Sequence, residues 1–133
     1  MRHAGAYWRA KSKAGEAVDA RIINTSSGAG LQGSVGQATY SAAKAGIAAL
    51  TLVAAAEMSR IAVTVNAIAP SARTRMTETV FADMMATQDQ AFDAMAPENV
   101  SPLVVWLGST ESRDVTGQVF EVEGGKIRVA EGW

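Results

Sequence analysis

Apolar and polar positions along this chain follow helical and strand periodicities in turn. Residues 2–14 have a helix-forming composition that Gly15 is expected to end, and residues 38–59 carry a longer, alanine-rich helical pattern. Short apolar or β-branched runs predict strands, which cover residues 21–25, 61–69 and 118–123. Pro70 is expected to stop the second of these strands.

The segments between these elements are less regular. Residues 26–37 are rich in serine and glycine and predict a loop, whereas residues 72–96 carry a helical pattern with Met and Phe side chains. Pro97 and Gly108 frame a further helix, and Gly124 and Gly125 turn the last strand into a short tail. This order of helices and strands implies an α/β fold with a parallel sheet and right-handed crossovers.

Three residues are candidates for chemistry. Tyr40 and Lys44 stand four apart in the long predicted helix, so they project from one face. An ammonium held beside a phenol favours the phenolate, which suits Tyr40 to general acid or base chemistry. Ser27 precedes Tyr40 by thirteen residues and could hold the substrate oxygen that gains or loses the proton. The alternative is a surface tyrosine beside a solvated lysine, because a YxxxK match is common by chance.

Five ordered motifs resemble those of the short-chain dehydrogenase/reductases. Residues 22–27 resemble the strand that delivers the catalytic serine of that family, and residues 36–46 resemble the entry to its active-site helix. Residues 63–70 resemble the next strand, with its proline beside the nicotinamide. Residues 97–100 and 116–125 resemble the closing helix and strand. The resemblance extends over nearly the whole chain.

The resemblance implies that residues 1–133 are a single partial domain, the C-terminal half of the family's fold. They would form the last three strands, with flanking helices, of a Rossmann-like, doubly wound parallel sheet. The N-terminal coenzyme-binding half, with its TGxxxGxG-type phosphate loop, is absent before Ser27. In the family, the strand at residues 21–25 pairs with a strand that this chain lacks, so we expect association or instability of the chain alone.

The same resemblance implies hydride transfer between a nicotinamide coenzyme and a carbonyl or alcohol. Ser27 would hydrogen-bond the substrate oxygen, Tyr40 would exchange a proton with it, and Lys44 would assist Tyr40 and hold the nicotinamide ribose. Pro70 and Thr74 would contact the nicotinamide, which makes Tyr40, Lys44, Pro70 and Thr74 the cofactor-binding set. The coenzyme is NAD or NADP, and the residues that choose between them belong to the absent half.

Several positions near this set depart from the family's pattern. Ser71 and Ala62 stand where the family usually has glycine, and the loop after Pro70 is one residue short. In that loop, Arg73 and Arg75 either meet an anionic coenzyme or acyl-carrier group or are solvated.

A GxGxxG sequence at residues 28–33 follows a predicted strand but does not match a dinucleotide fingerprint. In the true motif the glycines open directly into a helix, and an acidic residue follows about twenty positions on. Here Ser34, Val35 and Gly36 continue the loop, and the next acidic residue is Glu57. A flexible loop beside a substrate pocket is the better interpretation.

Composition and charge limit the kinds of partner and ligand that this chain is expected to bind. A net charge of −1 argues against nucleic acid, and the single His3 with scattered carboxylates shows no metal-ligand spacing. The uncharged, apolar stretch at residues 45–56 is shorter than a membrane span, and the absence of cysteine suits a cytoplasmic location. By resemblance, the first helix and the small-residue surface of residues 42–56 suit a homo-oligomer. Residues 76–95 lie where the family places a substrate lid, and their Met and Phe side chains suit an apolar or acyl-thioester substrate.

Three interpretations therefore stay open. The first is an NAD(P)-dependent oxidoreductase seen as its C-terminal half. The second is a truncated, catalytically inactive remnant that oligomerises. The third is a dehydratase or epimerase that uses the same Tyr40 and Lys44 in different chemistry.

Overall fold

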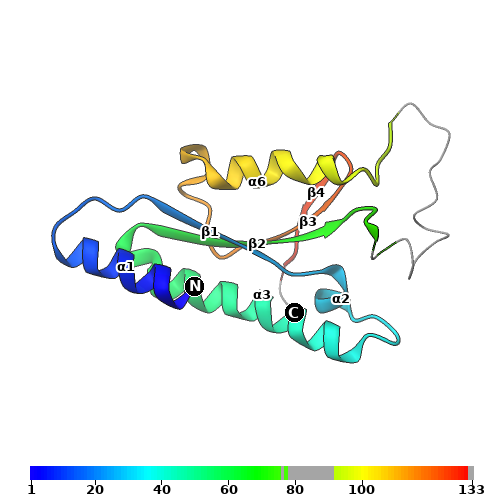
Figure 1. Ribbon diagram of the computed structural model, residues 1–133, viewed down its shortest axis with the longest axis horizontal. Helices are drawn as coiled ribbons and strands as arrows, with labels where there is room; N and C mark the ends of the chain where they lie inside the picture. The colour runs from blue at the N-terminus through cyan, green and yellow to red at the C-terminus, as the bar shows by residue number, and fades with distance from the viewer. Residues whose placement is uncertain (76, 78–91, 132–133) are drawn as a thin grey trace.

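The computed structural model describes residues 1–75, 77 and 92–131, which build a sheet between two layers of helices (Figure 1). The main elements in chain order are α1 (Arg2–Lys13), β1 (Ala20–Thr25), α2 (Gly28–Gln32), α3 (Ala38–Met58), β2 (Val63–Ser71), α6 (Ser101–Gly108), β3 (Val119–Glu123) and β4 (Lys126–Val129). Short 3₁₀ turns, η1 (Ser59–Ile61), η2 (Pro97–Val100) and η3 (Thr110–Ser112), adjoin α3 and α6.

The sheet has the order β1-β2-β3-β4. Strands β1, β2 and β3 are parallel, with Ala20 opposite Val63 and Ala67 opposite Val119, which confirms the predicted α/β class. The prediction of three strands was wrong by one, because the expected tail is a fourth strand, antiparallel to β3. Gly124, at φ 54°, occupies the left-handed region that this tight reversal requires.

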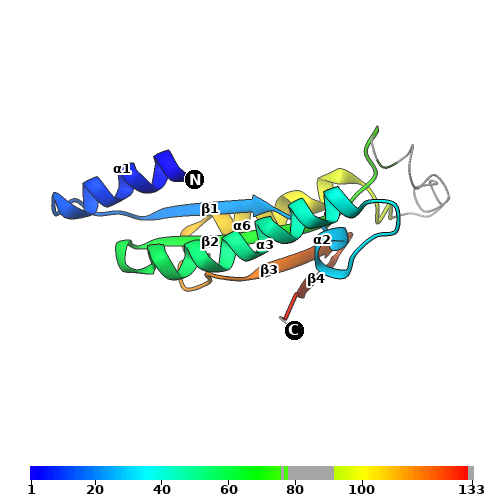
Figure 2. The ribbon, with the colours of Figure 1, turned by 90° about the horizontal axis from the view of Figure 1, so that it is seen from below.

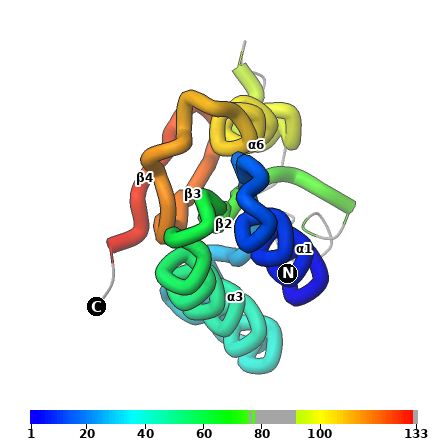
Figure 3. The backbone as a smooth tube through the Cα atoms, turned by 90° about the vertical axis from the view of Figure 1, so that its left-hand side faces the viewer, coloured from blue at the N-terminus to red at the C-terminus, as the bar shows by residue number. Residues whose placement is uncertain are grey.

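Helices cover both faces of the sheet, as a doubly wound fold requires. Helices α1 and α3 lie on one face and α6 lies on the other (Figures 1 and 3). Side chains alternate across β2, so that Val63 and Val65 pack with α3 whereas Ile68 packs with α6. Seen from below, α1 lies beside β1, and α3 runs under the middle of the sheet (Figure 2).

Three local predictions need correction. The segment 26–37 contains the short helix α2 rather than a continuous loop. Strand β2 runs through Pro70 to Ser71, because β1 ends opposite Ile68 and proline's missing N–H costs no bond to it there. Most of the predicted helix at 72–96 lies outside the described residues, and the described residues 92–96 are not helical.

The long helix raises the question of a membrane. By length and composition alone, the stretch Ala38–Ile61 could cross one, with a mean hydropathy of 1.3. Thr51, Ala54, Ala55 and Met58 of α3 are buried against the rest of the chain, although the apolar window as a whole is only 22% buried. One such helix is weak evidence for a membrane span, since core helices of soluble proteins pass the same test.

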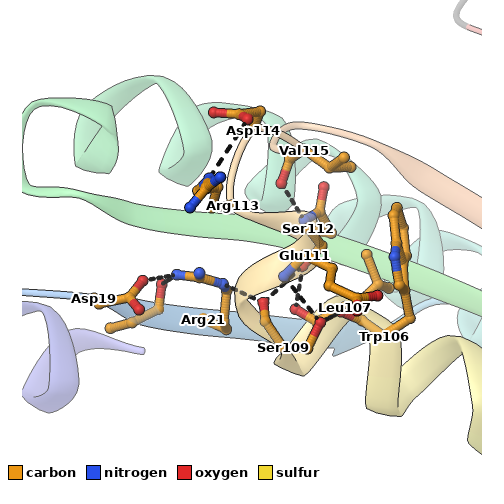
Figure 4. Close-up of polar contacts among 12 residues, drawn as sticks. Asp19, Arg21, Trp106, Leu107, Ser109, Glu111, Ser112, Arg113, Asp114 and Val115 are labelled. Carbon is orange, nitrogen blue, oxygen red and sulfur yellow. Dashed lines mark hydrogen bonds and ion pairs between the residues drawn. The ribbon is translucent and has the colours of Figure 1, made fainter.

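At the amino end of the parallel strands, Arg21 ties β1 to the end of α6 (Figure 4). Its Nε donates to the carbonyl of Ser109 at 3.2 Å, and its guanidinium pairs with Asp19 at 2.5 Å. Ser112 closes the turn after α6 by donating to the carbonyl of Leu107 at 3.0 Å. The opposite, carboxyl end of the sheet carries the candidate chemistry.

Candidate active site

The carboxyl end of β1 leads directly into Ser26 and Ser27. Helix α3 passes this end, and the Nζ of Lys44 donates to the carbonyl of Thr25 at 2.9 Å. The last carbonyl of β1 therefore meets the ammonium, and Ser27 follows two residues further on. Ligands of open parallel sheets bind at this end of the strands.

Tyr40 and Lys44 form the predicted pair. The Nζ of Lys44 lies 5.6 Å from the centre of the Tyr40 ring, within the range of a cation–π contact. Tyr40 is 43% exposed, so its ring is open to a ligand, whereas Lys44 is half-buried. An ammonium has three donors, and the bond to Thr25 uses one of them. The other two can serve a ligand that approaches Tyr40.

Ser27 has an extended backbone and caps α2. Its Oγ accepts a hydrogen bond from the N–H of Ala29 at 3.2 Å. Because Ser27 is the acceptor in this bond, its own hydroxyl proton can still be donated to a substrate oxygen. Ser27 is half-buried, and no hydrogen bond joins it to Tyr40 or Lys44 within the described part of the chain.

Two residues that the sequence analysis did not select hold Lys44 in place. Ser26 is 2% exposed and its Oγ donates to the carbonyl of Lys44 at 2.8 Å. Gly30 of α2 packs so closely that an added Cβ would lie 2.6 Å from the carbonyl carbon of Lys44 and from the N of Ala45. This explains the second glycine of the GxGxxG sequence, which serves close packing of α2 on α3. The signal for Ser26 was available, because it alternates with Asn24 along β1 and so faces α3.

The residues predicted to contact the nicotinamide, Pro70 and Thr74, lie at and after the carboxyl end of β2, the strand beside β1. Pro70 is half-buried in the end of β2, opposite Val122. Thr74 forms a local turn in which its N–H donates to the Oγ1 of Thr77 at 2.7 Å. Between residues 1–75, 77 and 92–131, no hydrogen bond connects Pro70 or Thr74 with Tyr40 or Lys44. Their assignment to the coenzyme stays a prediction.

Arg73 is not simply solvated. Its guanidinium pairs with Asp93, and its backbone N–H donates to the carbonyl of Met95 at 2.7 Å. These contacts join the segment after β2 to the segment before η2. Arg73 is therefore engaged in shaping the backbone beside the carboxyl end of β2.

A second tyrosine–lysine pair with the same spacing occurs in α1. Lys11 lies 5.7 Å from the centre of the Tyr7 ring, which nearly matches the distance in the Tyr40–Lys44 pair. Lys11 pairs with Glu16 at 3.2 Å rather than with a strand carbonyl. The spacing alone thus occurs twice, and only Tyr40 and Lys44 lie at a strand end.

A separate groove of about 800 Å³ lies between α2, α3, β3 and β4. Its lining includes Gly30, Ala45, Leu52, Val119 and Val129, but none of the three catalytic candidates.

The chain matches the family described as Enoyl-(Acyl carrier protein) reductase over residues 3–126. It is also similar to a hydroxyacyl-CoA dehydrogenase, ChsB1, of Mycobacterium tuberculosis, with 48% identity over 95% of the chain and 40% of that protein. A 3-oxoacyl-[acyl-carrier-protein] reductase of Synechocystis is 40% identical over 80% of the chain and 44% of that protein. The chain belongs to the short-chain dehydrogenase/reductase family.

Among solved structures, a short-chain dehydrogenase from Mycobacterium avium superposes with a TM-score of 0.85 and is 77% identical. The match covers the whole of this chain and 42% of the other. The chain thus spans less than half the length of these relatives.

Proposed function

We propose that this chain carries the proton-transfer half of an NAD(P)-dependent oxidoreductase that interconverts a carbonyl and an alcohol. The observation that carries the proposal is the position of Lys44 Nζ, 2.9 Å from the last carbonyl of β1 and 5.6 Å from the Tyr40 ring. This places a phenol, an ammonium and a serine hydroxyl at the carboxyl end of one parallel strand.

In the proposed chemistry, Ser27 donates its hydroxyl proton in a hydrogen bond to the substrate oxygen and so orients it. Tyr40 gives its phenolic proton to that oxygen in reduction and takes it back in oxidation. The Lys44 ammonium stabilises the negative charge on the tyrosine oxygen between these steps. The bond from Lys44 to Thr25 holds the ammonium in place without a ligand.

The coenzyme's nicotinamide end fits these residues. The remaining donors of Lys44 and the exposed hydroxyl of Tyr40 can hold ribose hydroxyls, and a bound NADH or NADPH supplies the hydride. The described residues offer no comparable site for the pyrophosphate, because α2 is a five-residue helix whose N-terminus is capped by Ser27. Pro70 and Thr74 complete the proposed contacts with the nicotinamide.

We propose an acyl thioester with a 3-oxo or 3-hydroxy group as the substrate. Similar proteins bear the names hydroxyacyl-CoA dehydrogenase and 3-oxoacyl-[acyl-carrier-protein] reductase, which describe this one chemical class. The open approach to Tyr40 suits a substrate whose long carrier group stays outside.

The test is titration of NADH and NADPH into the purified chain by calorimetry, followed by turnover of acetoacetyl-CoA at 340 nm. Saturable binding in the micromolar range, with turnover that Tyr40→Phe abolishes, would support the proposal for the isolated chain. Turnover that persists in Tyr40→Phe would contradict the role of Tyr40. Release of water or epimerisation without coenzyme oxidation would favour the dehydratase or epimerase interpretation.

The second candidate is an inactive, oligomerising remnant. It is favoured by β1, which pairs only with β2 in the described sheet and so leaves one strand edge open for association. A folded oligomer that binds neither NADH nor NADPH would support this candidate and exclude activity of the isolated chain.

We further propose a homo-oligomer in a cytoplasmic location, with no nucleic-acid or membrane partner. Leu50, Leu52 and Val53 are each at least half exposed on α3, and Tyr7 is exposed on α1. An apolar helix face of this kind suits contact with a copy of the same helix, and the charges of Lys44, Glu57 and Arg60 oppose insertion in a bilayer. The mass from light scattering tests the oligomer.

A further inference from the structure

Helix α3 is attached to β1 by two polar contacts on one face of the strand. Ser26 Oγ donates to the carbonyl of Lys44 at 2.8 Å, and Asn24 Nδ2 donates to the Oγ1 of Thr51 at 2.9 Å. Asn24 and Ser26 are two apart on a strand, and Lys44 and Thr51 are two turns apart on a helix, so each pair shares a face. The two contacts therefore fix both the position of α3 along β1 and its rotation.

The contact from Ser26 reaches the backbone of Lys44 itself. Ser26 is almost fully buried, and its N–H is also bonded, to the carbonyl of Ile68 at 2.8 Å, so its hydroxyl approaches from a fixed backbone. From the neighbouring side, Gly30 leaves no room for an added Cβ beside Lys44 and Ala45. Ser26 and Gly30 thus hold the main chain of Lys44 from two directions.

We infer that Ser26 is a positioning residue for Lys44: through the Lys44 carbonyl it sets where the ammonium meets the Thr25 carbonyl and the Tyr40 ring. The inference rests on the proposed function, in which Lys44 stabilises the charge of Tyr40. Ser26 does not contact substrate in this scheme, whereas Ser27 does. In this scheme Ser26 positions the lysine, and the adjacent Ser27 binds the substrate.

The readout is the acetylation rate of Lys44, measured by competitive labelling with deuterated and light acetic anhydride followed by mass spectrometry. In Ser26→Ala, we expect Lys44 to react roughly two- to tenfold faster, because its ammonium loses a well-placed acceptor. Lys11, on the other helix, should keep its rate and serves as the internal standard. Ser26→Thr, which restores a hydroxyl, should return Lys44 toward the rate of the unmodified chain.

Two variants separate positioning from stability. Ser41→Ala removes a buried α3 hydroxyl that has no hydrogen-bond partner in the described structure, so it should leave the Lys44 rate unchanged. Asn24→Ala breaks the hydrogen bond to Thr51. It should lower the melting temperature without raising the acetylation rate of Lys44. An unchanged Lys44 rate in Ser26→Ala, or an equal rise in all three variants, would overturn the inference.

Should Ser26→Ala fail to fold, labelling of the unmodified chain still tests whether Lys44 is held at the Thr25 carbonyl, which the inference requires. We expect its Lys44 to react more slowly than exposed Lys13, because Lys44 is held at the Thr25 carbonyl. Equal rates would contradict the inference. Labelling needs no turnover, so a faster Lys44 in Ser26→Ala, together with no coenzyme binding by the unmodified chain, would support positioning and reject the proposed function.

Discussion

Helices α1 and α3 each present a tyrosine and a lysine with nearly the same geometry. The ammonium-to-ring distances are 5.7 Å for Lys11 and Tyr7 and 5.6 Å for Lys44 and Tyr40. Beyond this, the two pairs differ. Lys11 binds the exposed carboxylate of Glu16, whereas Lys44 binds the last carbonyl of a parallel strand, with Ser27 two residues further along the chain.

The comparison shows that the spacing alone brings a lysine over a tyrosine ring in both helices. In the proposed function, the position at a strand end distinguishes the Tyr40–Lys44 pair. Lys11 is engaged by the carboxylate of Glu16 as well as by Tyr7. A lysine beside a neutral carbonyl keeps its positive charge available for the phenol and for a ligand. The two helices therefore serve as candidate and internal control in the same molecule.

The largest expected effect comes from removing the two phenolic hydroxyls separately. Tyr40→Phe should lower kcat by about 10²- to 10⁴-fold in any preparation that shows coenzyme-dependent turnover, because general acid–base catalysis contributes that much. Tyr7→Phe should leave kcat within about twofold, since surface changes away from the site have small effects. Oxidation of NADPH at 340 nm measures both. Comparable losses in the two variants would abolish the distinction between the pairs.

Replacing a glycine near each tyrosine–lysine pair with alanine gives the next largest effect. Gly30→Ala forces a Cβ to 2.6 Å from the backbone of Lys44 and Ala45, which cannot yield easily, so we expect a loss of about 2–3 kcal/mol in the free energy of unfolding. Gly5→Ala, in α1, meets only the flexible Cε of Met58 at 2.7 Å. Its better helix propensity should offset that contact to within about 1 kcal/mol.

Urea denaturation followed by circular dichroism measures both changes. Loss of stability in Gly5→Ala that equals the loss in Gly30→Ala would show that α2 does not brace the Lys44 backbone. A tolerated Gly30→Ala would likewise contradict the close packing.

These contacts also mark what the sequence could and could not predict. Periodicity located α1, β1 and α3 closely, because each carries a long or strongly patterned run, and the motifs identified Ser27, Tyr40 and Lys44. The tail became β4 because Gly124 and Gly125 fold the chain back onto β3, a pairing that a four-residue run does not signal by itself.

Ser26 and Gly30, which hold the backbone of Lys44, were not among the predicted site residues for a different reason. Ser26 and Gly30 act through the backbone of Lys44. Alternation with Asn24 predicts which face of β1 Ser26 shares, but the contact with Lys44 and the close approach of Gly30 depend on how α2 and α3 pack. Ala62 was noticed as an unusual residue where glycine is expected. Its φ of 53°, the one positive value among the described non-glycine residues, supplies the physical reason.

The ends of the two helices allow a third, smaller test. After α1, Gly15 adopts φ 76° at no steric cost, whereas after α3 and η1 the same left-handed region is occupied by Ala62. Ala62→Gly should therefore stabilise the chain by about 1 kcal/mol, and Gly15→Ala should destabilise it by a similar amount. Thermal unfolding measures both shifts, which should have opposite signs. A destabilised Ala62→Gly would show that the strain at this position is negligible.

The smallest effect concerns the charge of Lys11. The hydrogen bond to Glu16 raises the pKa of Lys11 above its ordinary value of 10.5, with the nearby Tyr7 adding to the shift. A raised pKa in the folded chain means that this contact stabilises fully below pH 10.5 and that the stabilisation is lost as the pH rises through the folded value. The melting temperatures of the unmodified chain and of Lys11→Met should therefore differ slightly at pH 9 and converge as the pH rises past the raised pKa of Lys11. Because Lys11 is solvated, the difference should be smaller than the shift from Ala62→Gly, and salt should reduce it. A difference that instead grows with pH would show that Lys11 is not held by Glu16, and the contrast with Lys44 would lose its electrostatic basis.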